Sequence, residues 1–257
     1  MPTMSGIHYS LNDQTEIKTA PPLILIHGAG GSLLTWHPYV RRLAGCRVYA
    51  LDLPGHGNSE GPGRQTIADY ARDVLNFMDH VQIQTAVVAG FSMGSAVALT
   101  LVIDHPERFA GLALLGGGAK MPVSPTFLNT AGDPATFESA VDTITKYSFT
   151  PQAPQDLLHL SKQNMMKVSP AALVGDFLAC NQFDVTSDLP GITLPTIILC
   201  GAEDVMTPPK FSRFLHEQIP NSSLHILKQA GHMITLEQPR EVADLLSQFM
   251  DGLPPRS

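Results

Sequence analysis

The chain alternates between short, continuously apolar runs and longer stretches in which apolar residues recur at helical spacing. Each run is four to six residues long, a typical strand length, and unbroken apolar character is typical of a parallel strand covered on both faces. The runs lie at residues 23–27, 47–51, 85–90, 112–115, 196–200 and 224–227. We therefore expect these six runs to be strands of a mostly parallel central sheet.

Helical periodicity is found between these strands. In residues 66–80, apolar side chains recur three and four positions apart, as on one face of a helix. Other helices are predicted at residues 35–44, at 93–104, from Pro208 onward and at 239–250. Strands that alternate with helices predict an α/β fold, with helices flanking a mostly parallel central sheet.

This alternation is interrupted once. Between residues 121 and 190 no buried strand is evident, and helical stretches occur instead at 135–147, 155–166 and 170–181. We interpret residues 121–190 as a helical cap inserted into the domain. The core would then consist of residues 1–120 and 191–257.

Composition narrows the class of protein. The 257 residues are 44% apolar and 15% charged, as in an ordinary globular domain. The net charge of −7 and the absence of a basic patch argue against a nucleic-acid partner. The apolar runs are too short to span a bilayer, so no membrane partner is expected. The first residues have no cationic region followed by an apolar run, so we expect a cytoplasmic protein, as a monomer or homodimer.

The three cysteines suggest neither a disulfide framework nor a metal site. Cys46, Cys180 and Cys200 are odd in number, and their spacing matches no zinc motif. We expect reduced thiols, no bound metal and no cofactor.

A nucleophile motif follows the third predicted strand. Residues 90–94 read Gly-Phe-Ser-Met-Gly, which matches G-x-S-x-G, and they lie between a strand and a helix as this motif requires. Such a turn would present the Ser92 hydroxyl at the carboxyl edge of the sheet. The backbone N–H of Met93 would lie at a helix N-terminus, where it can bind a developing oxyanion. We predict that Ser92 is a nucleophile and that Met93 is one oxyanion donor.

A glycine-rich loop follows the first predicted strand. Residues 27–31 read His-Gly-Ala-Gly-Gly, and the N–H of Ala29 is the second predicted oxyanion donor. The alternative is a phosphate-binding loop. That reading is disfavoured because Leu33 occupies the position where a dinucleotide-binding motif needs glycine, and no Walker lysine follows. His27 is expected to hold the loop by hydrogen bonds rather than to act as a base.

An acid and a base follow two of the later strands. Asp204 lies in the turn after residues 196–200, with the neighbouring Glu203 as the alternative acid. His232 lies in a loop after the last predicted strand and is the predicted base. It would remove the proton of Ser92, while Asp204 would orient its imidazole.

With two further motifs, the chain resembles the α/β-hydrolase superfamily. The motifs are Asp-Leu-Pro-Gly-His-Gly-Asn-Ser at residues 52–59 and His-Pro-Glu-Arg at 105–108, and the resemblance covers residues 21–249. It extends to the branch of the superfamily with a serine nucleophile and a helical cap. It implies the α/β-hydrolase fold, a Ser-Asp-His triad and structural rather than catalytic roles for Asp52 and His56.

The motifs also separate activities within the superfamily. Haloalkane dehalogenases and epoxide hydrolases use an aspartate where this chain has Ser92, so both are disfavoured. Among the remaining activities, the chain most resembles carboxylesterases and enol-lactonases. Alternatives are serine-type haloperoxidases with perhydrolase activity and C–C bond hydrolases. Several of the latter carry Gly-Pro-Gly in the oxyanion loop, where this chain has Gly28-Ala29-Gly30.

The sequence thus predicts a serine hydrolase acting on a small carboxylic ester or lactone through an acyl-enzyme. A non-enzymatic small-molecule receptor on the same fold is a second class, because a receptor can keep the triad. An acyl or alkyl group needs an apolar cavity between core and cap. The predicted lining residues are Gly28, Phe91, Met121, Phe127, Met165 and Phe177.

Overall fold

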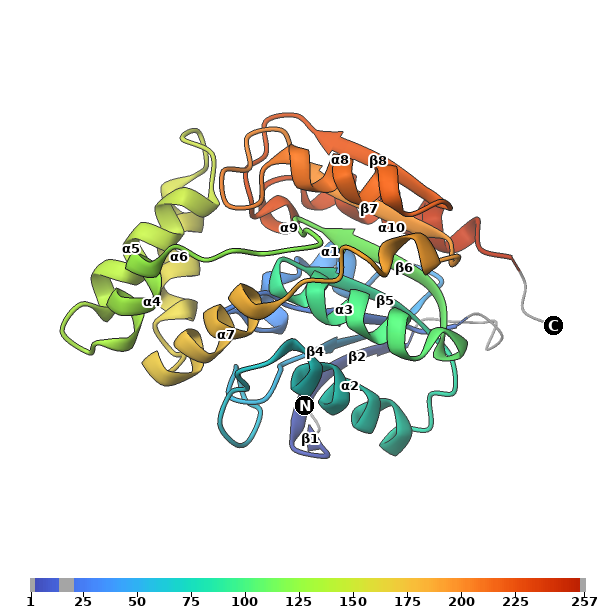
Figure 1. Cartoon of the computed structure of the whole chain (residues 1–257), viewed down its shortest axis with the longest axis horizontal. Coiled ribbons are helices and arrows are strands. Elements are labelled where there is room, and N and C mark those ends of the chain that lie inside the picture. The colour runs from blue at the N-terminus through green and yellow to red at the C-terminus, as the bar shows by residue number, and fades with distance from the viewer. Residues whose placement is uncertain (1–2, 14–20, 255–257) are drawn as a thin grey trace.

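The computed structural model describes residues 3–13 and 21–254, which form a sheet flanked by helices (Figure 1). The sheet has eight strands in the order β1-β2-β4-β3-β5-β6-β7-β8 in this part of the chain. The strands are β1 (Thr3–Met4), β2 (Ile7–Asp13), β3 (Leu23–Ile26), β4 (Arg47–Leu51), β5 (Ala86–Phe91), β6 (Phe109–Leu115), β7 (Thr196–Gly201) and β8 (Ser222–Leu227). From β4 to β8 all pairs are parallel, whereas β1 and β2 are antiparallel to their neighbours. The predicted α/β fold with a mostly parallel sheet is confirmed.

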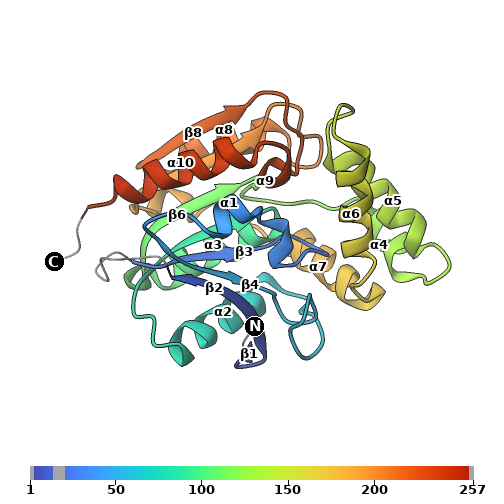
Figure 2. The same ribbon diagram turned by 180° about the vertical axis from the view of Figure 1, so that it is seen from behind.

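Helices cover both faces of the sheet. One face packs against α2 (Ile67–His80), α3 (Met93–Asp104) and α8 (Pro209–Gln218). The opposite face, seen in Figure 2, packs against α1 (Pro38–Arg41) and α10 (Pro239–Asp251). Short helical segments lie at η1 (Leu33–Thr35), η2 (Pro106–Arg108), η3 (Leu189–Gly191) and α9 (Ile234–Glu237).

Two local expectations need correction. The helix expected at residues 35–44 is two short pieces, η1 and α1, because Pro38 cannot donate a backbone hydrogen bond within a continuous helix and instead begins α1. The antiparallel strand β2 was not expected. Its buried residues come first and its second half alternates between partly and fully exposed side chains, so no continuous apolar run marks it.

Four helices lie between β6 and β7, and we call them the inserted helices. They are α4 (Pro125–Gly132), α5 (Phe137–Ser148), α6 (Gln155–Met165) and α7 (Pro170–Gln182), and they lie together at one end of the sheet (Figure 1). They share their own hydrophobic cluster, which includes Phe137, Ile144 and Leu173. The assignment of residues 121–190 to a separate subdomain stays a prediction. None of the described helices is both long and apolar enough to cross a membrane.

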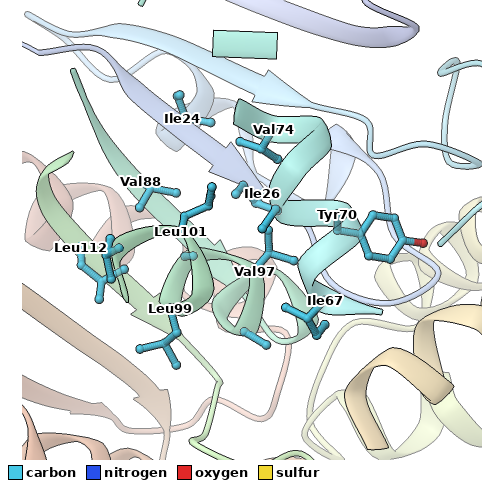
Figure 3. Packing of buried hydrophobic residues seen from close by; sticks show 14 of the residues in the cluster. Ile24, Ile26, Ile67, Tyr70, Val74, Val88, Val97, Leu99, Leu101 and Leu112 are labelled. Carbon is cyan, nitrogen blue, oxygen red and sulfur yellow. The ribbon is translucent and has the colours of Figure 1, made fainter. Parts of the chain in front are cut away.

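The largest core cluster lies between the sheet and the pair α2–α3. Ile24, Ile26 and Val88 from the sheet point toward Val97 and Leu101 of α3 (Figure 3). Side chains of α2, among them Tyr70 and Val74, belong to the same cluster. This core fixes α3, and with it the turn that joins β5 to α3.

Truncation of a leucine in this core should cost much more stability than truncation of an exposed one. Leu101 on α3 is fully buried, whereas Leu160 on α6 is 54% exposed. We expect Leu101→Ala to lower the free energy of unfolding by about 2–5 kcal/mol because it leaves a cavity. Leu160→Ala should change it by no more than about 0.5 kcal/mol. Urea denaturation followed by circular dichroism measures both, and equal losses would contradict this packing.

Candidate active site

Ser92 occupies the sharp turn between β5 and α3. Its backbone angles are φ 53° and ψ −119°, a conformation that is strained for a residue with a side chain. The turn also needs glycine on both sides. A Cβ atom at Gly94 would lie 2.2 Å from the carbonyl oxygen of Ile26, and one at Gly90 would lie 2.0 Å from that of Gly94. Only glycine therefore allows β3, β5 and α3 to approach closely enough to form this turn.

Ser92, His232 and Asp204 lie in one continuous hydrogen-bond chain. The Nε2 atom of His232 lies 2.9 Å from Oγ of Ser92, and its Nδ1 atom lies 2.8 Å from Oδ2 of Asp204. His232 and Asp204 are buried, while Ser92 is partly exposed. A neutral imidazole that donates from Nδ1 to the carboxylate presents the lone pair of Nε2 to the serine hydroxyl.

Asp204 is held as an anion by several donors. Its Oδ1 atom accepts the N–H groups of Met206 and Thr207, both at 2.8 Å, and its Oδ2 atom lies 2.8 Å from the hydroxyl of Thr207. Burial opposes the charge, but the attraction of His232 and these hydrogen bonds outweigh it and lower the pKa of Asp204. The contribution of Thr207 was missed because no motif marked it. The alternative acid, Glu203, is exposed.

The glycine-rich loop lies directly against Ser92. A Cβ atom at Gly28 would lie 2.9 Å from the Cβ of Ser92. The loop turns back on itself through a hydrogen bond from the N–H of Gly31 to the carbonyl of Gly28 at 3.1 Å. This placement brings Ala29 beside Ser92, and the two residues line the same cavity. Met93, the other predicted donor, is the first residue of α3.

His27 holds this loop in place. Its Nε2 atom accepts the N–H of Leu53 at 2.9 Å, so the ring proton lies on Nδ1, which donates to the carbonyl of Gly28 at 2.8 Å. Asp52 supports the same region by accepting the N–H groups of Leu33 and Asn58. Both residues therefore make structural contacts.

Two cavities meet at the loop. One, of about 240 Å³, is lined by Ser92 and His232, and the other has a volume of about 70 Å³; Ala29 lines both. The structure distributes the six predicted pocket residues between them. Gly28, Phe91 and Met165 line the smaller cavity, and Met121, Phe127 and Phe177 line the larger one. Apolar surface dominates both walls.

Glu237 joins the inserted helices to the loop that carries His232. One carboxylate oxygen accepts the N–H of Thr150 just after α5, at 2.8 Å, and the other accepts the N–H of Gly231 at 2.9 Å. The N–H of Met233 also donates to the carbonyl of Ser148 at 2.9 Å. Of the two neighbours of His232, Met233 is thus bonded directly to the end of α5, and Gly231 is linked to Thr150 through Glu237. Sequence reasoning did not find Glu237.

A second buried polar cluster lies under the glycine-rich loop. Asp176 of α7 is fully buried and accepts hydrogen bonds from Nε2 of His56 at 2.8 Å and from the hydroxyl of Tyr70 at 2.5 Å. It also accepts the N–H of Gly30 at 2.8 Å. Asp176 was missed, although a single aspartate within the apolar stretch of residues 171–180 was a usable signal.

His56 of this cluster and the neighbouring His27 carry opposite pKa shifts. Burial, followed by repulsion from His56, lowers the pKa of His27 to about 4. Burial also disfavours a charged His56, but the attraction of the Asp176 carboxylate and its hydrogen bonds outweigh this effect and raise the pKa of His56. The rings lie 4.9 Å apart, so one charge on the pair is favoured over two.

The comparison with known proteins identifies the family. Residues 21–239 match the family described as the alpha/beta hydrolase fold. The chain belongs to this family.

Individual relatives cover most of the chain. A 2-hydroxymuconate semialdehyde hydrolase of Pseudomonas putida is 30% identical over 264 residues, which are 96% of this chain and 92% of that protein. The 3-oxoadipate enol-lactonase 1 of Acinetobacter baylyi is 24% identical over 267 residues, 97% of this chain and all of that protein (100%). The structure of an enol-lactonase from Burkholderia xenovorans LB400 has a TM-score of 0.89 at 24% identity and shares the fold, with 95% of this chain and 96% of that chain covered.

One relative is a longer protein. The dihydrolipoyllysine-residue acetyltransferase component of the acetoin cleaving system of Pseudomonas putida is 30% identical over 244 residues, which are 89% of this chain. The chain spans only 63% of that protein's length.

The opposite shifts of the two histidines can be observed directly. At pH 7 we expect His27 to be neutral with its proton on Nδ1, since its pKa is about 4, and His56 to titrate only above the ordinary value of 6.5. Nitrogen-15 chemical shifts of the imidazoles report both states, and His56→Asn assigns the His56 signals. A His56 midpoint at or below 6.5 would contradict the ion pair with Asp176.

Proposed function

We propose that this chain is a serine hydrolase that cleaves small carboxylic esters or lactones through an acyl-enzyme intermediate. The hydrogen-bond chain from Ser92 through His232 to Asp204 is the observation that carries this proposal. A hydroxyl becomes a useful nucleophile when an oriented base accepts its proton. In this proposal His232 is that base.

The acylation step follows from the positions of these groups. Ser92 Oγ attacks the carbonyl carbon while its proton passes to Nε2 of His232. The N–H groups of Ala29 and Met93 stabilise the negative charge that develops on the carbonyl oxygen. The imidazolium then gives its proton to the leaving oxygen, and the bond between carbonyl carbon and that oxygen breaks. Asp204 stabilises the imidazolium through its 2.8 Å contact with Nδ1.

Deacylation repeats these steps with water as the nucleophile. His232 accepts a proton from water, which attacks the acyl carbon, and the proton returns to Oγ of Ser92 as the acid leaves. The same two N–H groups stabilise the second oxyanion. Apart from substrate and water, the proposed cycle uses only the triad and these two N–H groups.

The cavities support a small substrate. Apolar walls of the larger cavity, which come largely from the inserted helices and the segment before them, suit an acyl or alkyl group. Its volume of about 240 Å³ favours short chains. The similarity to an enol-lactonase over 97% of this chain supports cyclic as well as open esters. We further propose that residues 121–190 act as a cap over the site.

C–C bond hydrolysis is the alternative that one comparison favours. One of the two relatives reported at 30% identity is a 2-hydroxymuconate semialdehyde hydrolase. The loop reads Gly28-Ala29-Gly30 where several C–C bond hydrolases carry Gly-Pro-Gly, which weighs against this alternative. Turnover of a vinylogous 1,5-diketone at a rate above that of any ester would replace the first proposal with this one.

Replacement of the nucleophile tests the proposal. Wild-type protein should release p-nitrophenol from acetate and butyrate esters faster than from octanoate and laurate, because the cavity is small. Ser92→Ala should lower kcat/KM by about 10³-fold or more, since the variant keeps only the oxyanion donors and binding. The assay is absorbance of p-nitrophenolate under steady-state conditions, with circular dichroism to establish that the variant is folded.

The opposite result would remove the hydrolase proposal. If no ester turned over and Ser92 did not react with an organophosphonate, a receptor function would become the leading alternative. Ligand-induced change without product would then be its signature.

A matched pair of variants tests the identity of the acid. Asp204→Asn should lower kcat by about 10³–10⁴-fold, because an amide can neither stabilise the imidazolium nor select the required tautomer. Glu203→Gln changes a neighbouring exposed carboxylate and should leave kcat within about twofold. Both are measured with p-nitrophenyl butyrate, and the reverse pattern would assign the role to Glu203.

A further inference from the structure

Asp176 is a charged residue in an unusual place. It lies on α7, one of the inserted helices, yet all three of its described donors belong to the core: the N–H of Gly30, the ring of His56 and the hydroxyl of Tyr70. Tyr70 extends from α2 with its hydroxyl directed away from the aliphatic side chains of the core (Figure 3). A buried carboxylate is retained at low cost only when such donors satisfy it.

The packing of α7 brings this carboxylate to the loop. A Cβ atom at Gly175 would lie 2.6 Å from the carbonyl oxygen of Arg64, so glycine allows the helix to touch the core backbone. Leu173 lies one turn before Asp176 on α7 and packs against Gly30. A Cβ atom at Gly30 would lie 2.8 Å from the Cδ1 atom of Leu173. Gly30 itself has φ +61°, a left-handed conformation that the loop requires.

The charge state of the cluster follows from its hydrogen bonds. His56 faces acceptors at both ring nitrogens: Pro54 O lies 3.0 Å from Nδ1, and Oδ2 of Asp176 lies 2.8 Å from Nε2. When both nitrogens carry a proton, His56 is an imidazolium that balances the Asp176 carboxylate, and the raised pKa of His56 favours this state. The Oδ2 atom that pairs with His56 is also the atom that accepts from Gly30.

We propose that Asp176 is a positioning residue that fixes the oxyanion loop through the N–H of Gly30. This inference rests on the proposed function, because it concerns the donor geometry of Ala29, the residue that precedes Gly30. With Gly30 held from below by α7, the N–H of Ala29 stays directed toward the oxyanion. Asp176 does not touch the substrate and lines neither cavity.

Replacement of Asp176 by asparagine removes the charge and one acceptor oxygen but keeps the size of the side chain. The oxygen of an amide at the Oδ2 position could accept from both Gly30 and His56 only if His56 were a buried, uncompensated imidazolium, or a neutral ring whose unprotonated Nδ1 faced the carbonyl oxygen of Pro54. An amide nitrogen at that position could accept from neither. Asp176→Asn therefore weakens the contact with Gly30 while it preserves side-chain volume. A misdirected donor weakens transition-state binding but leaves ground-state binding to the apolar cavities intact.

Steady-state kinetics provide the first test. With p-nitrophenyl butyrate, Asp176→Asn should lower kcat by about 10- to 100-fold and leave KM within about threefold. Affinity for a trifluoromethyl ketone, whose adduct with Ser92 bears an oxyanion, should fall by the same factor as kcat/KM. Asp79→Asn removes a carboxylate from a surface ion pair with Arg108 and should leave both values unchanged. An unchanged kcat in Asp176→Asn would overturn the proposal.

Amide hydrogen exchange provides a test that does not depend on catalysis. Exchange at Ala29 and Gly30 should accelerate at least about tenfold in Asp176→Asn, relative to wild type, because the loop loses its anchor. Unchanged exchange would overturn the positioning role even if activity fell. Accelerated exchange in a protein whose wild type turns over no ester would overturn the proposed function and leave the loop anchor established.

A second variant covers the case in which Asp176→Asn does not fold. His56→Asn keeps the carboxylate but removes its counter-charge, so the carboxylate becomes a weaker acceptor for Gly30 once it takes up a proton. We expect kcat to fall about fivefold or more with little change in KM. A wild-type kcat in folded His56→Asn would contradict the coupling.

Discussion

The parallel register of the central strands is the constraint on which the site depends. Ile26, the last residue of β3, pairs with Gly90, and the neighbouring Phe91 pairs with Leu115. Leu115 pairs in turn with Leu199 of β7. Because parallel strands end at one edge, the loops that follow these strands emerge at the same level of the sheet. Residues more than 100 positions apart in the chain thereby come within hydrogen-bonding distance of one another.

Close backbone contacts turn that shared edge into a defined geometry. A Cβ atom at Gly201 would lie 2.1 Å from the carbonyl oxygen of Gly231, so the turn with Asp204 and the loop with His232 cross at glycine. The contact between Gly94 and the end of β3 does the same for the loop beside Ser92. A side chain at either glycine would clash with the neighbouring backbone and force the loops apart. The glycines in the motifs are therefore explained by backbone approach, with chemistry as the consequence.

Local signals accounted for most of the fold. The apolar runs at the central strands and the helical periodicity of α2 correspond to elements that bury these residues, and the apolar α3 is buried along most of its length. The pattern of burial could therefore be predicted from the sequence. The elements that were missed lack such a pattern: β2 is exposed along its second half, and α4 buries only Ala131. A short motif likewise indicated Ser92, because the residues that form its turn, 90–94, are adjacent in the sequence.

What the sequence could not indicate is long-range polar pairing outside the recognised motifs. Asp176 and Gly30 are separated by 146 positions, and Glu237 and Thr150 by 87. Neither carboxylate belongs to a motif, and their partners are backbone N–H groups, which every residue except proline carries. Only the placement of α7 and of the segment after α5 against the core makes these pairs specific.

The same pairs give the inserted helices a role beyond covering the cavities. Glu237 ties the end of α5 to the loop of His232, and Asp176 ties α7 to the loop of Ala29. Hydrogen bonds to charged groups each contribute about 1.5–3 kcal/mol, so a displacement of these helices that broke both contacts would be opposed by several kcal/mol. An opening of the site that kept both contacts would have to occur elsewhere, in α4 or α6. Through these contacts α5 and α7 fix the positions of the loops that carry His232 and Ala29, whereas α4 packs on α5 and α7 and α6 packs on α5.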